Sequence, residues 1–414
     1  MLDKKTFVNL LLINHYAGSP HHGMEFRPFH LAESWIARGH NVRIVASSYS
    51  HVRQRQPVLT ERTLLERVGT VEYLWLRNRP YQGNGFGRLI NMLQFTSMLA
   101  ARSKELAAWK PDVVIASSTY PYDIWPAARI ARLAKAKLVH EVHDLWPLTP
   151  VQLGGHDRWH PMIYSMQLAE DYACKHADKV ISILPGTEKY LRGRGLQPGK
   201  FAHVPNGFSP ELEKQPLPVE ANRQLEEFAS RYKTLCAYVG GHGVANALDH
   251  LIAAASDPAV ADIGFVLVGN GPLKPALIAT AAKLKCRNVL FLDPIPKACV
   301  STLLQRTDMA FIGLSPSPLY LYGTSPNKLF DYMLAGLPIV HSIDTPEYDL
   351  VKTANCGISV PAADSHAIAV AVSQIAAMPK EARMLIGQRG QAYVRANHTY
   401  PVLADQFIES LTSI

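Results

Sequence analysis

Short apolar runs alternate with amphipathic segments along nearly the whole chain, and this alternation constrains the fold more than any other feature of the sequence. The first run, residues 7–14, is continuous, as expected of a strand buried on both faces of a parallel sheet. Residues 26–38 follow with apolar side chains at helical spacing, Gly39 ends that helix, and residues 41–46 form the next strand. Repeated strand–helix–strand units predict α/β domains with mostly parallel sheets.

Two rounds of this alternation are present, separated by a Pro- and Glu-rich stretch at residues 208–232. At 414 residues, the chain has about twice the length of a typical domain. We therefore expect two doubly wound domains at 1–207 and 233–396. They are joined by a linker at 208–232 and face a ligand-binding cleft, and a last helix in 397–414 returns to the first domain. Within the first domain, residues 48–69 are expected to form a polar loop and residues 89–110 one long helix.

Positive charge is concentrated in the first half of the chain. Residues 1–205 carry 26 Lys and Arg against 16 Asp and Glu, a balance of +10, and the remainder carries 16 against 18, a balance of −2. A domain of that sign attracts phosphates, whether of nucleic acid, anionic lipid or a small substrate, although a basic surface without a partner has the same charge. The basic helical segment 89–110 also suits an anionic membrane surface, and a core helix with a solvated basic rim fits equally well.

The rest of the composition argues against several protein classes. The five cysteines are scattered and odd in number, so we expect neither a disulfide framework nor a metal-binding Cys pair, and a reducing cytoplasm is the simplest compartment. No apolar run approaches the length of a membrane span, and the first residues lead into a strand without a signal-peptide pattern. Basic residues are not interleaved with aromatics in a recognisable nucleic-acid-binding module, so no nucleic acid is expected as a partner.

Two strand ends in the first domain hold candidate site residues. The loop after the first strand contains several glycines and histidines, but it lacks a G-x-G-x-x-G pattern, and neither acidic partners nor helical spacing supports a metal site. The strand ending in His140-Glu-Val-His-Asp-Leu-Trp-Pro147 brings titratable groups to the edge where α/β sheets bind ligands. His143 and Asp144 are the best candidates there for catalysis or sugar contact. Alternatively, Asp144 caps a turn and Trp146 packs locally.

The stretch from Ser325 to Val340 predicts a loop, a capped helix and a strand. Ser325 suits the N-cap and Pro326 the first helical position. Lys328 and Asp331 then lie in the first two turns, where exposed N–H groups favour an anion. A lysine at a helix N-terminus suits a phosphate, and a carboxylate one turn later suits hydroxyl groups, which together describe a nucleoside diphosphate. An ordinary capped helix of an α/β domain has the same pattern.

In combination, these motifs resemble the group 1 (family 4) retaining glycosyltransferases of GT-B fold, over essentially the whole chain. In the second domain the resemblance rests on the turn at 240–243, Val268-Gly-Asn-Gly-Pro272, Asp308 and residues 325–336. In the first domain it rests on Arg38-Gly-His40, Asp144, Ala177-Asp-Lys-Val180 and Val204-Pro-Asn-Gly207. Residues 141–147, 240–243 and 325–331 are most similar to a subgroup related to N-acetyl-L-fucosamine and other amino-sugar transferases of O-antigen and capsule assembly.

The resemblance implies transfer of a sugar from a UDP-sugar, with retention at the anomeric carbon and no required cofactor or metal. The implied acceptor is a polyprenyl-diphosphate-linked sugar or glycan in bacterial surface polysaccharide biosynthesis. The implied location is the cytoplasm, peripherally on the inner face of the plasma membrane. The expected catalytic residues are Asp144, His143 and Lys328. The expected donor-binding residues are Gly241, His242, Gly243, Asn246, Gly269, Gly271, Ser325, Asn327, Lys328 and Asp331, and the expected acceptor-binding residues are Gly18, His22, Gly23, Arg27 and Tyr120.

The sequence departs from the family pattern at three places. Asp331 matches the second acid of the family's E-x7-E pair, which contacts the ribose, but Gly323 occupies the position of the first acid. The Arg and Lys that usually bind the diphosphate fall close to Gly241 and Asn246, which carry no charge. We therefore expect Lys328 to stabilise the departing diphosphate. Two alternatives are a GT-B protein that does not transfer, such as a UDP-sugar 2-epimerase, and an inactive nucleotide-sugar-binding module, which the missing first acid would allow.

Overall fold

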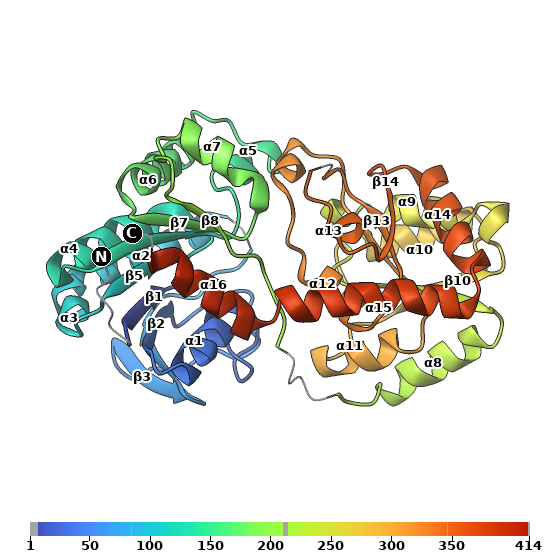
Figure 1. Cartoon of the computed structure of the whole chain (residues 1–414), viewed down its shortest axis with the longest axis horizontal. Coiled ribbons are helices and arrows are strands. Elements are labelled where there is room, and N and C mark those ends of the chain that lie inside the picture. The colour runs from blue at the N-terminus through green and yellow to red at the C-terminus, as the bar shows by residue number, and fades with distance from the viewer. Residues whose placement is uncertain (1–6, 84, 210–213, 346, 413–414) are drawn as a thin grey trace. The chain divides into compact units, whose positions relative to one another are not determined.

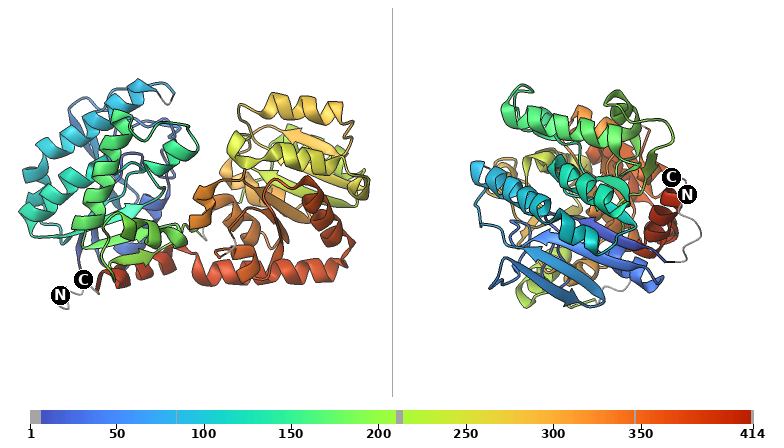
Figure 2. Two further views of the ribbon diagram at one scale, coloured as in Figure 1. Left: turned by 90° about the horizontal axis from the view of Figure 1, so that it is seen from above. Right: turned by 90° about the vertical axis from the view of Figure 1, so that its left-hand side faces the viewer.

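The computed structural model describes residues 7–83, 85–209, 214–345 and 347–412. The chain divides into two compact units (Figure 1). The first contains Met1–Gly207 and Tyr400–Ile414, and the second contains Phe208–Thr399. Figures 1 and 2 show helices on both sides of the sheet in each unit.

The first unit is built on an eight-stranded sheet in the order β3-β4-β2-β1-β5-β6-β7-β8. Neighbouring strands are parallel except β3 and β4. The strand order reverses between β1 and β5, so the loops after these strands lie at a switch point, where open α/β sheets bind ligands. The strands are β1 (Asn9–Ile13), β2 (Asn41–Ser47), β3 (Thr63–Val68), β4 (Val71–Leu76), β5 (Val113–Ala116), β6 (Lys137–Val142), β7 (Lys179–Ser182) and β8 (Phe201–His203).

Helices cover both faces of this sheet, which is why the first strand is a continuous apolar run. Leu10 and Leu12 pack towards α1 and α16, whereas Leu11 and Ile13 pack towards α2, α3, α4 and α6. The helices of the unit are α1 (Arg27–Ala37), α2 (Phe86–Ala101), α3 (Ser103–Ala108), α4 (Ile124–Ala134), α5 (Leu148–Gln152), α6 (Pro161–His176), α7 (Glu188–Gly193) and α16 (Tyr400–Thr412).

The second unit has a six-stranded parallel sheet in the order β11-β10-β9-β12-β13-β14, with its switch point between β9 and β12. The strands are β9 (Thr234–Val239), β10 (Ile263–Val268), β11 (Val289–Leu292), β12 (Met309–Gly313), β13 (Ile339–Ser342) and β14 (Gly357–Val360). The helices are α8 (Val219–Ala229), α9 (Leu248–Ala255), α10 (Lys274–Lys283), α11 (Lys297–Leu304), α12 (Asn327–Leu334), α13 (Leu350–Thr353), α14 (Ser365–Ala377) and α15 (Lys380–Asn397).

Two local expectations for the first domain were wrong. The stretch 48–69 is not all loop, because β3 pairs antiparallel with β4 along the edge of the sheet. None of its side chains is fully buried, so this edge strand lacks the apolar run of the inner strands. The stretch 89–110 is not one helix, because the regular helical path breaks at Arg102 between α2 and α3.

The stretch 208–232, expected as a linker, includes α8 and groups with the second unit. Leu225 and Phe228 anchor this helix in the core of that unit. Only one narrow face of α8 is apolar. Because the surrounding sequence is rich in Pro and Glu, this weak pattern did not indicate a helix.

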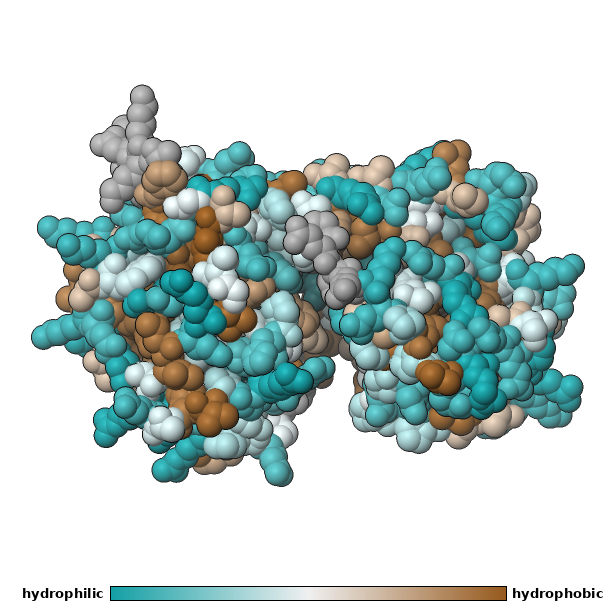
Figure 3. All heavy atoms as spheres, turned by 90° about the horizontal axis from the view of Figure 1, so that it is seen from below, coloured by the Kyte–Doolittle hydropathy of each residue, from teal (hydrophilic) through white to brown (hydrophobic). Residues whose placement is uncertain are grey.

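The surface is mixed in polarity. On the face shown in Figure 3, hydrophilic side chains predominate and apolar ones form separate patches. Among the helices that the structure describes, none is both long and apolar enough to cross a membrane.

The C-terminal helix α16 packs against α1, as expected from the sequence, and completes one face of the first unit. The Trp35 indole donates a hydrogen bond to the Ala404 carbonyl (3.1 Å) and meets the Phe407 ring edge-on with centroids 5.0 Å apart. Arg38 forms an ion pair with Asp405 at the side of this contact. The apolar side of α16 therefore belongs to the same core as β1 and α1.

We expect Phe407→Ala to lower the free energy of unfolding of the first unit by about 3–5 kcal/mol, because it leaves a cavity beside a fully buried Trp35. Glu409→Ala on the exposed side of the same helix is the matched control and should change stability by less than about 0.5 kcal/mol. Denaturant titration followed by fluorescence measures both. Equal stabilities would mean that α16 does not contribute to the core.

Candidate functional site

A buried ion pair organises the carboxyl ends of the central strands in the first unit. Arg27, at the first position of α1, donates from Nε (3.0 Å) and Nη2 (2.9 Å) to Glu141 Oε1 at the end of β6. The same guanidinium donates to the carbonyls of Val204 (2.9 Å) and Pro205 (2.5 Å). Arg27 was predicted to bind the acceptor; in this structure its side chain is 1% exposed, and its guanidinium is engaged by Glu141 and the two carbonyls.

The second oxygen of Glu141 connects this pair to His143. Ser117 donates its hydroxyl proton to Oε2 (2.6 Å), and His143 Nε2 lies 3.2 Å from Oε2 and 2.9 Å from the Ser117 hydroxyl. Burial by itself would raise the pKa of Glu141, but the charges of Arg27 and His143 and the hydrogen bonds outweigh burial and hold the pKa below its usual range. The carboxylate therefore stays ionised and fixes the imidazole of His143 at the strand end.

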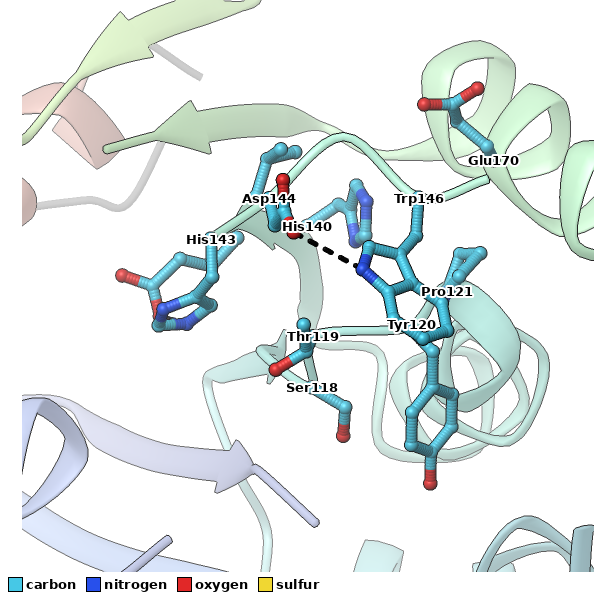
Figure 4. A pocket seen from close by; sticks show the side chains of 11 residues that line it. Ser118, Thr119, Tyr120, Pro121, His140, His143, Asp144, Trp146 and Glu170 are labelled. Atoms are coloured by element: carbon cyan, nitrogen blue, oxygen red, sulfur yellow. Dashed lines mark hydrogen bonds and ion pairs between the residues drawn. The ribbon is translucent and has the colours of Figure 1, made fainter. Parts of the chain in front are cut away.

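Asp144 borders a pocket beyond this network (Figure 4). Its carboxylate accepts from the Leu145 amide (2.9 Å), the Thr149 hydroxyl (2.7 Å) and the Trp146 indole (3.2 Å). Burial raises its pKa, against the effect of these bonds. The turn-capping alternative thus describes the contacts of Asp144 in this structure. The pocket is lined by Ser118, Thr119, Tyr120, Pro121, His140, Glu141, Val142, His143, Asp144, Trp146 and Glu170.

Glu170, on α6, is a pocket residue that the sequence motifs did not indicate. Burial raises its pKa to about 7, while Tyr190 (2.7 Å) and Gln167 (2.6 Å) donate to its Oε2. Glu170 lies inside a regular helix and is distant in sequence from the strand-end motifs, so its place in the pocket is apparent only from the structure.

The loop after β1 is folded tightly on itself. The Ser19 amide donates to the Gly23 carbonyl (3.1 Å), and the Gly23 amide donates back (2.7 Å). A Cβ on Gly18 would lie 1.8 Å from the Gly23 carbonyl oxygen, so both glycines shape the loop. His22 is buried and lies 3.5 Å from Glu66, and the fully buried Tyr120 bonds to His15 through its hydroxyl. Across the described part of the chain, no cluster of three or more His, Cys, Asp or Glu side chains is arranged to hold a metal ion.

In the second unit, Lys328 reaches the end of β9 from the first turn of α12. Its ammonium donates to the Tyr238 hydroxyl (2.9 Å) and to Asn246 Oδ1 (2.5 Å), and it lies 4.7 Å from the centre of the Tyr238 ring. Asn246 in turn donates to the Gly241 carbonyl (3.0 Å). Lys328 therefore occupies the region where the family resemblance places its diphosphate-binding cations.

The partners of Lys328 are neutral, which governs its protonation. Burial lowers its pKa to about 8. The ammonium predominates at neutral pH, and no carboxylate of the residues that the structure describes forms an ion pair with it, so a bound anion would favour the charged form.

Two glycine-rich loops lie beside this lysine with no space for side chains between them. A Cβ on Gly269 would lie 2.0 Å from the Gly240 carbonyl oxygen, and one on Gly271 would lie 2.5 Å from the His242 carbonyl oxygen. The His242 amide donates to the Asn270 carbonyl (2.8 Å), while both ring nitrogens of this buried histidine lack partners. Burial and then the charges of two lysines lower its pKa to about 4, so its ring is neutral at pH 7.

Asp331 has a partner that the sequence did not suggest. Lys297 at the start of α11 donates to both carboxylate oxygens (2.6 and 2.5 Å). Burial raises the pKa of Asp331, and Lys297 opposes that rise. Lys297 is separated from Asp331 by more than thirty positions and belongs to no motif, so only the packing of α11 beside α12 reveals it.

The start of α12 differs from the expected cap by one position. Pro326 is the N-cap and Asn327 is the first helical residue, with no side-chain cap hydrogen bond. Ser325 is buried, and Asn327 is exposed. Gly323, where the family resemblance places its first acid, has φ 89° and ψ 171°, a conformation that is essentially restricted to glycine.

Family models match both units of the chain. Residues 22–207 match the model described as "Glycosyl transferase 4-like domain", and residues 233–378 match "Glycosyl transferases group 1". The chain belongs to the glycosyltransferases. No curated protein matches its sequence.

Solved structures confirm the GT-B fold of this glycosyltransferase. A sucrose-phosphate synthase from Thermosynechococcus elongatus is similar with a TM-score of 0.72 and 18% identity, over 98% of each chain. Anabaena Alr3699/HepE in complex with UDP-glucose has a TM-score of 0.66 and 16% identity, over 98% of this chain and 100% of that one. WaaG, a glycosyltransferase involved in lipopolysaccharide biosynthesis, has a TM-score of 0.64 and 18% identity, over 95% and 98%.

We expect Arg27→Met to destabilise the first unit by about 3–5 kcal/mol, because the buried Glu141 carboxylate loses its compensating charge. Arg192→Met is the control, since it breaks an exposed ion pair with Glu188 and should cost only about 0.3–0.5 kcal/mol. Adding Glu141→Gln to Arg27→Met should recover part of the loss. Denaturation midpoints at pH 7 test this, and equal effects of the two arginine substitutions would contradict it.

Proposed function

We propose that this glycosyltransferase moves a sugar, with retention, from a UDP-sugar bound by the second unit to an acceptor bound by the first. The observation that carries the proposal is the Lys328 ammonium, whose hydrogen-bond partners among the described residues are neutral oxygens and which lies beside two closely packed glycine loops. Such loops bring backbone N–H groups close to an anion, and a lysine supplies its counter-charge.

The diphosphate of the donor would lie between Lys328 and the loops at Gly240–Gly243 and Gly269–Gly271. Asp331, together with Lys297, would bind the ribose hydroxyls, and Ser325 and Asn327 at the helix start would add polar contacts. The structure of Anabaena Alr3699/HepE with UDP-glucose supports UDP as the nucleotide. The missing acid at Gly323 leaves the donor sugar to be held by backbone groups of this turn.

For the reaction, we propose that the acceptor hydroxyl attacks the anomeric carbon as the bond to the UDP oxygen breaks. The departing phosphate takes the proton of that hydroxyl, so no separate base is needed. Lys328 stabilises the negative charge that develops on the phosphate. His143 and Asp144 orient the acceptor or the donor sugar, and Tyr120 with the loop holding Gly18, His22 and Gly23 shapes the acceptor side.

The finer assignment is an N-acetylated amino-sugar transferase that acts on a polyprenyl-diphosphate-linked acceptor at the inner face of the plasma membrane. One face of α2 supports the membrane part, because Phe86, Ile90 and Leu93 are exposed at helical spacing. Exposed Arg77 and Arg79 precede this helix. Apolar insertion flanked by basic residues is the arrangement that binds anionic lipid.

Lys328→Met should lower turnover about 100-fold or more, since removal of one charge contact to a developing oxyanion costs about 3 kcal/mol. Product formation from a panel of UDP-sugars with a lipid-diphosphate acceptor measures turnover. Lys283→Met, at an exposed position of α10 in the same unit, is the matched control and should have a much smaller effect. Wild-type turnover in folded Lys328→Met would rule out the proposed role.

The same lysine predicts a pH dependence for UDP binding. Its ammonium is present below the pKa of about 8 and is lost as the pH rises through that value. The terminal phosphate is already ionised above pH 7. UDP affinity should therefore fall about tenfold from pH 7 to pH 9 in the wild type and stay nearly constant in Lys328→Met. Calorimetry at both pH values measures this, and equal pH profiles would contradict it.

For the membrane assignment, Phe86→Ser with Leu93→Ser should reduce binding to anionic liposomes about tenfold or more, because two inserted side chains are lost. Ile278→Ser is the control, since Ile278 is similarly exposed on α10 of the second unit. Co-sedimentation at low and high salt measures binding. Equal binding of the double variant and the control would remove α2 as the contact surface.

A further inference from the structure

Arg53 in the first unit is a buried cation without a counter-ion. Its side chain is 5% exposed, and its guanidinium lies 4.9 Å from the centre of the Trp75 ring. Nη2 donates to the Ser47 carbonyl, but Nε and Nη1 have no partner. No carboxylate of the described residues forms an ion pair with it. A buried charge in this condition is strongly unfavourable unless an anion compensates it.

Other basic groups gather around Arg53 at the carboxyl ends of β1, β2 and β4. The half-buried Arg88 donates from Nε to the Tyr16 hydroxyl (3.1 Å), and its guanidinium lies 5.4 Å from the centres of both the Tyr16 and the Trp146 rings. The exposed His51 has Nδ1 2.6 Å from the Tyr81 hydroxyl. Aromatic rings and basic side chains thus form one surface at this edge of the sheet.

The charges of this group act on one another. Burial and then the charge of Arg53 lower the pKa of His15, and Arg88 adds to this effect. The pKa of His51 is lowered by burial and by Arg88. Glu66, a carboxylate of the neighbouring β3, is engaged by the Trp75 indole (2.6 Å) and lies 3.5 Å from His22. The charge of Arg53 therefore adds to a positive potential at these strand ends.

Three loops are tied together around this cluster. The Gln54 and Arg55 amides each donate to the His22 carbonyl (3.0 Å), which joins the loops after β1 and β2. The Tyr49 hydroxyl donates to the Tyr81 carbonyl (2.9 Å), which joins the loops after β2 and β4. The cluster is therefore built into the framework at the strand ends and is not a chance meeting of surface side chains.

We propose that Arg53 and Arg88, with the hydroxyls of Tyr16 and Tyr81 and the imidazole of His51, form an anion site that holds a phosphate or diphosphate group of the acceptor. Guanidinium forks match phosphate oxygens, and phenol and imidazole groups add hydrogen bonds. This inference rests on the proposed function, which assigns the donor to Lys328 in the other unit and the acceptor to this one. The same chemistry would accept a lipid diphosphate or a sugar phosphate.

The test measures binding of inorganic pyrophosphate to the full chain by calorimetry and by the shift in thermal midpoint, with Lys328→Met in every sample so that the proposed donor site does not bind the probe. Arg53→Met and Arg88→Met should each weaken pyrophosphate binding at least tenfold. Arg55→Met is the matched control, because Arg55 lies on the same loop and is exposed, and it should change binding less than twofold. Arg53→Met should also melt at the same or a higher temperature than the wild type, because an uncompensated buried charge is removed.

Farnesyl diphosphate and glucose 6-phosphate identify the source of the anion. Tighter binding of farnesyl diphosphate than of pyrophosphate, lost in Arg88→Met, assigns a lipid diphosphate. Competition by glucose 6-phosphate at similar concentrations assigns a sugar phosphate. Pyrophosphate binding that is equal in all variants, or weakened equally by Arg55→Met, would overturn the site.

UDP binding separates this inference from the proposed function. Arg53→Met and Arg88→Met should bind UDP as the wild type does, since the donor residues lie in the second unit. If the wild type does not bind UDP, the proposed function is wrong, but the pyrophosphate measurements still test the anion site. If UDP binds normally and pyrophosphate binding is unchanged in Arg53→Met and Arg88→Met, only the inference about the anion site is wrong.

Discussion

The buried pairing of Arg27 with Glu141 is the contact on which the first unit depends. One guanidinium joins the start of α1, the end of β6 and the chain leaving β8, and through Glu141 it also reaches Ser117 and His143. The loops at the switch point are thereby fixed to one another by charge and not only by apolar packing. Buried pairs of this kind contribute little net stability, but they tolerate no loss of one partner. Loss of either partner is therefore expected to disturb all of these strand ends together.

The second unit uses lysine in two contrasting ways. The Lys274 ammonium donates to the Gly269 and Leu292 carbonyls and pairs with Asp293. These contacts neutralise its charge and hold the loop after β10. Among the described residues, Lys328 contacts neutral oxygens and an aromatic ring. The first lysine holds the loop after β10 through its ion pair and carbonyl contacts, whereas the second has no carboxylate partner in the described part of the chain. Burial and then both lysines lower the pKa of His242, whose ring lies near the rings of Tyr238 and Phe291.

Most of the architecture was predictable because strand–helix alternation and strand-end loops are local signals. The continuous run at 7–14 correctly predicted β1, and the motif at 325–340 correctly predicted α12 followed by β13. β3 and α8 were missed because an edge strand and a narrowly amphipathic helix bury too little apolar surface to show in the sequence. Lys297, Glu170 and Arg53 could not be predicted, since their importance comes from neighbours that are distant in the chain. The burial of Arg27, which was predicted to bind the acceptor, could not be read from the sequence either, because its partner Glu141 is distant in the chain.

The backbone at Gly323 limits which residues the turn before α12 accepts. It follows the short turn Pro318–Tyr322 and has φ 89° and ψ 171°, where a side chain is strongly disfavoured. Glutamate at this position would therefore strain the turn as well as add a carboxyl group. A new charge could be introduced here without strain only if the path of the turn changed at the same time, so engineering this position means redesigning the whole segment that leads into α12.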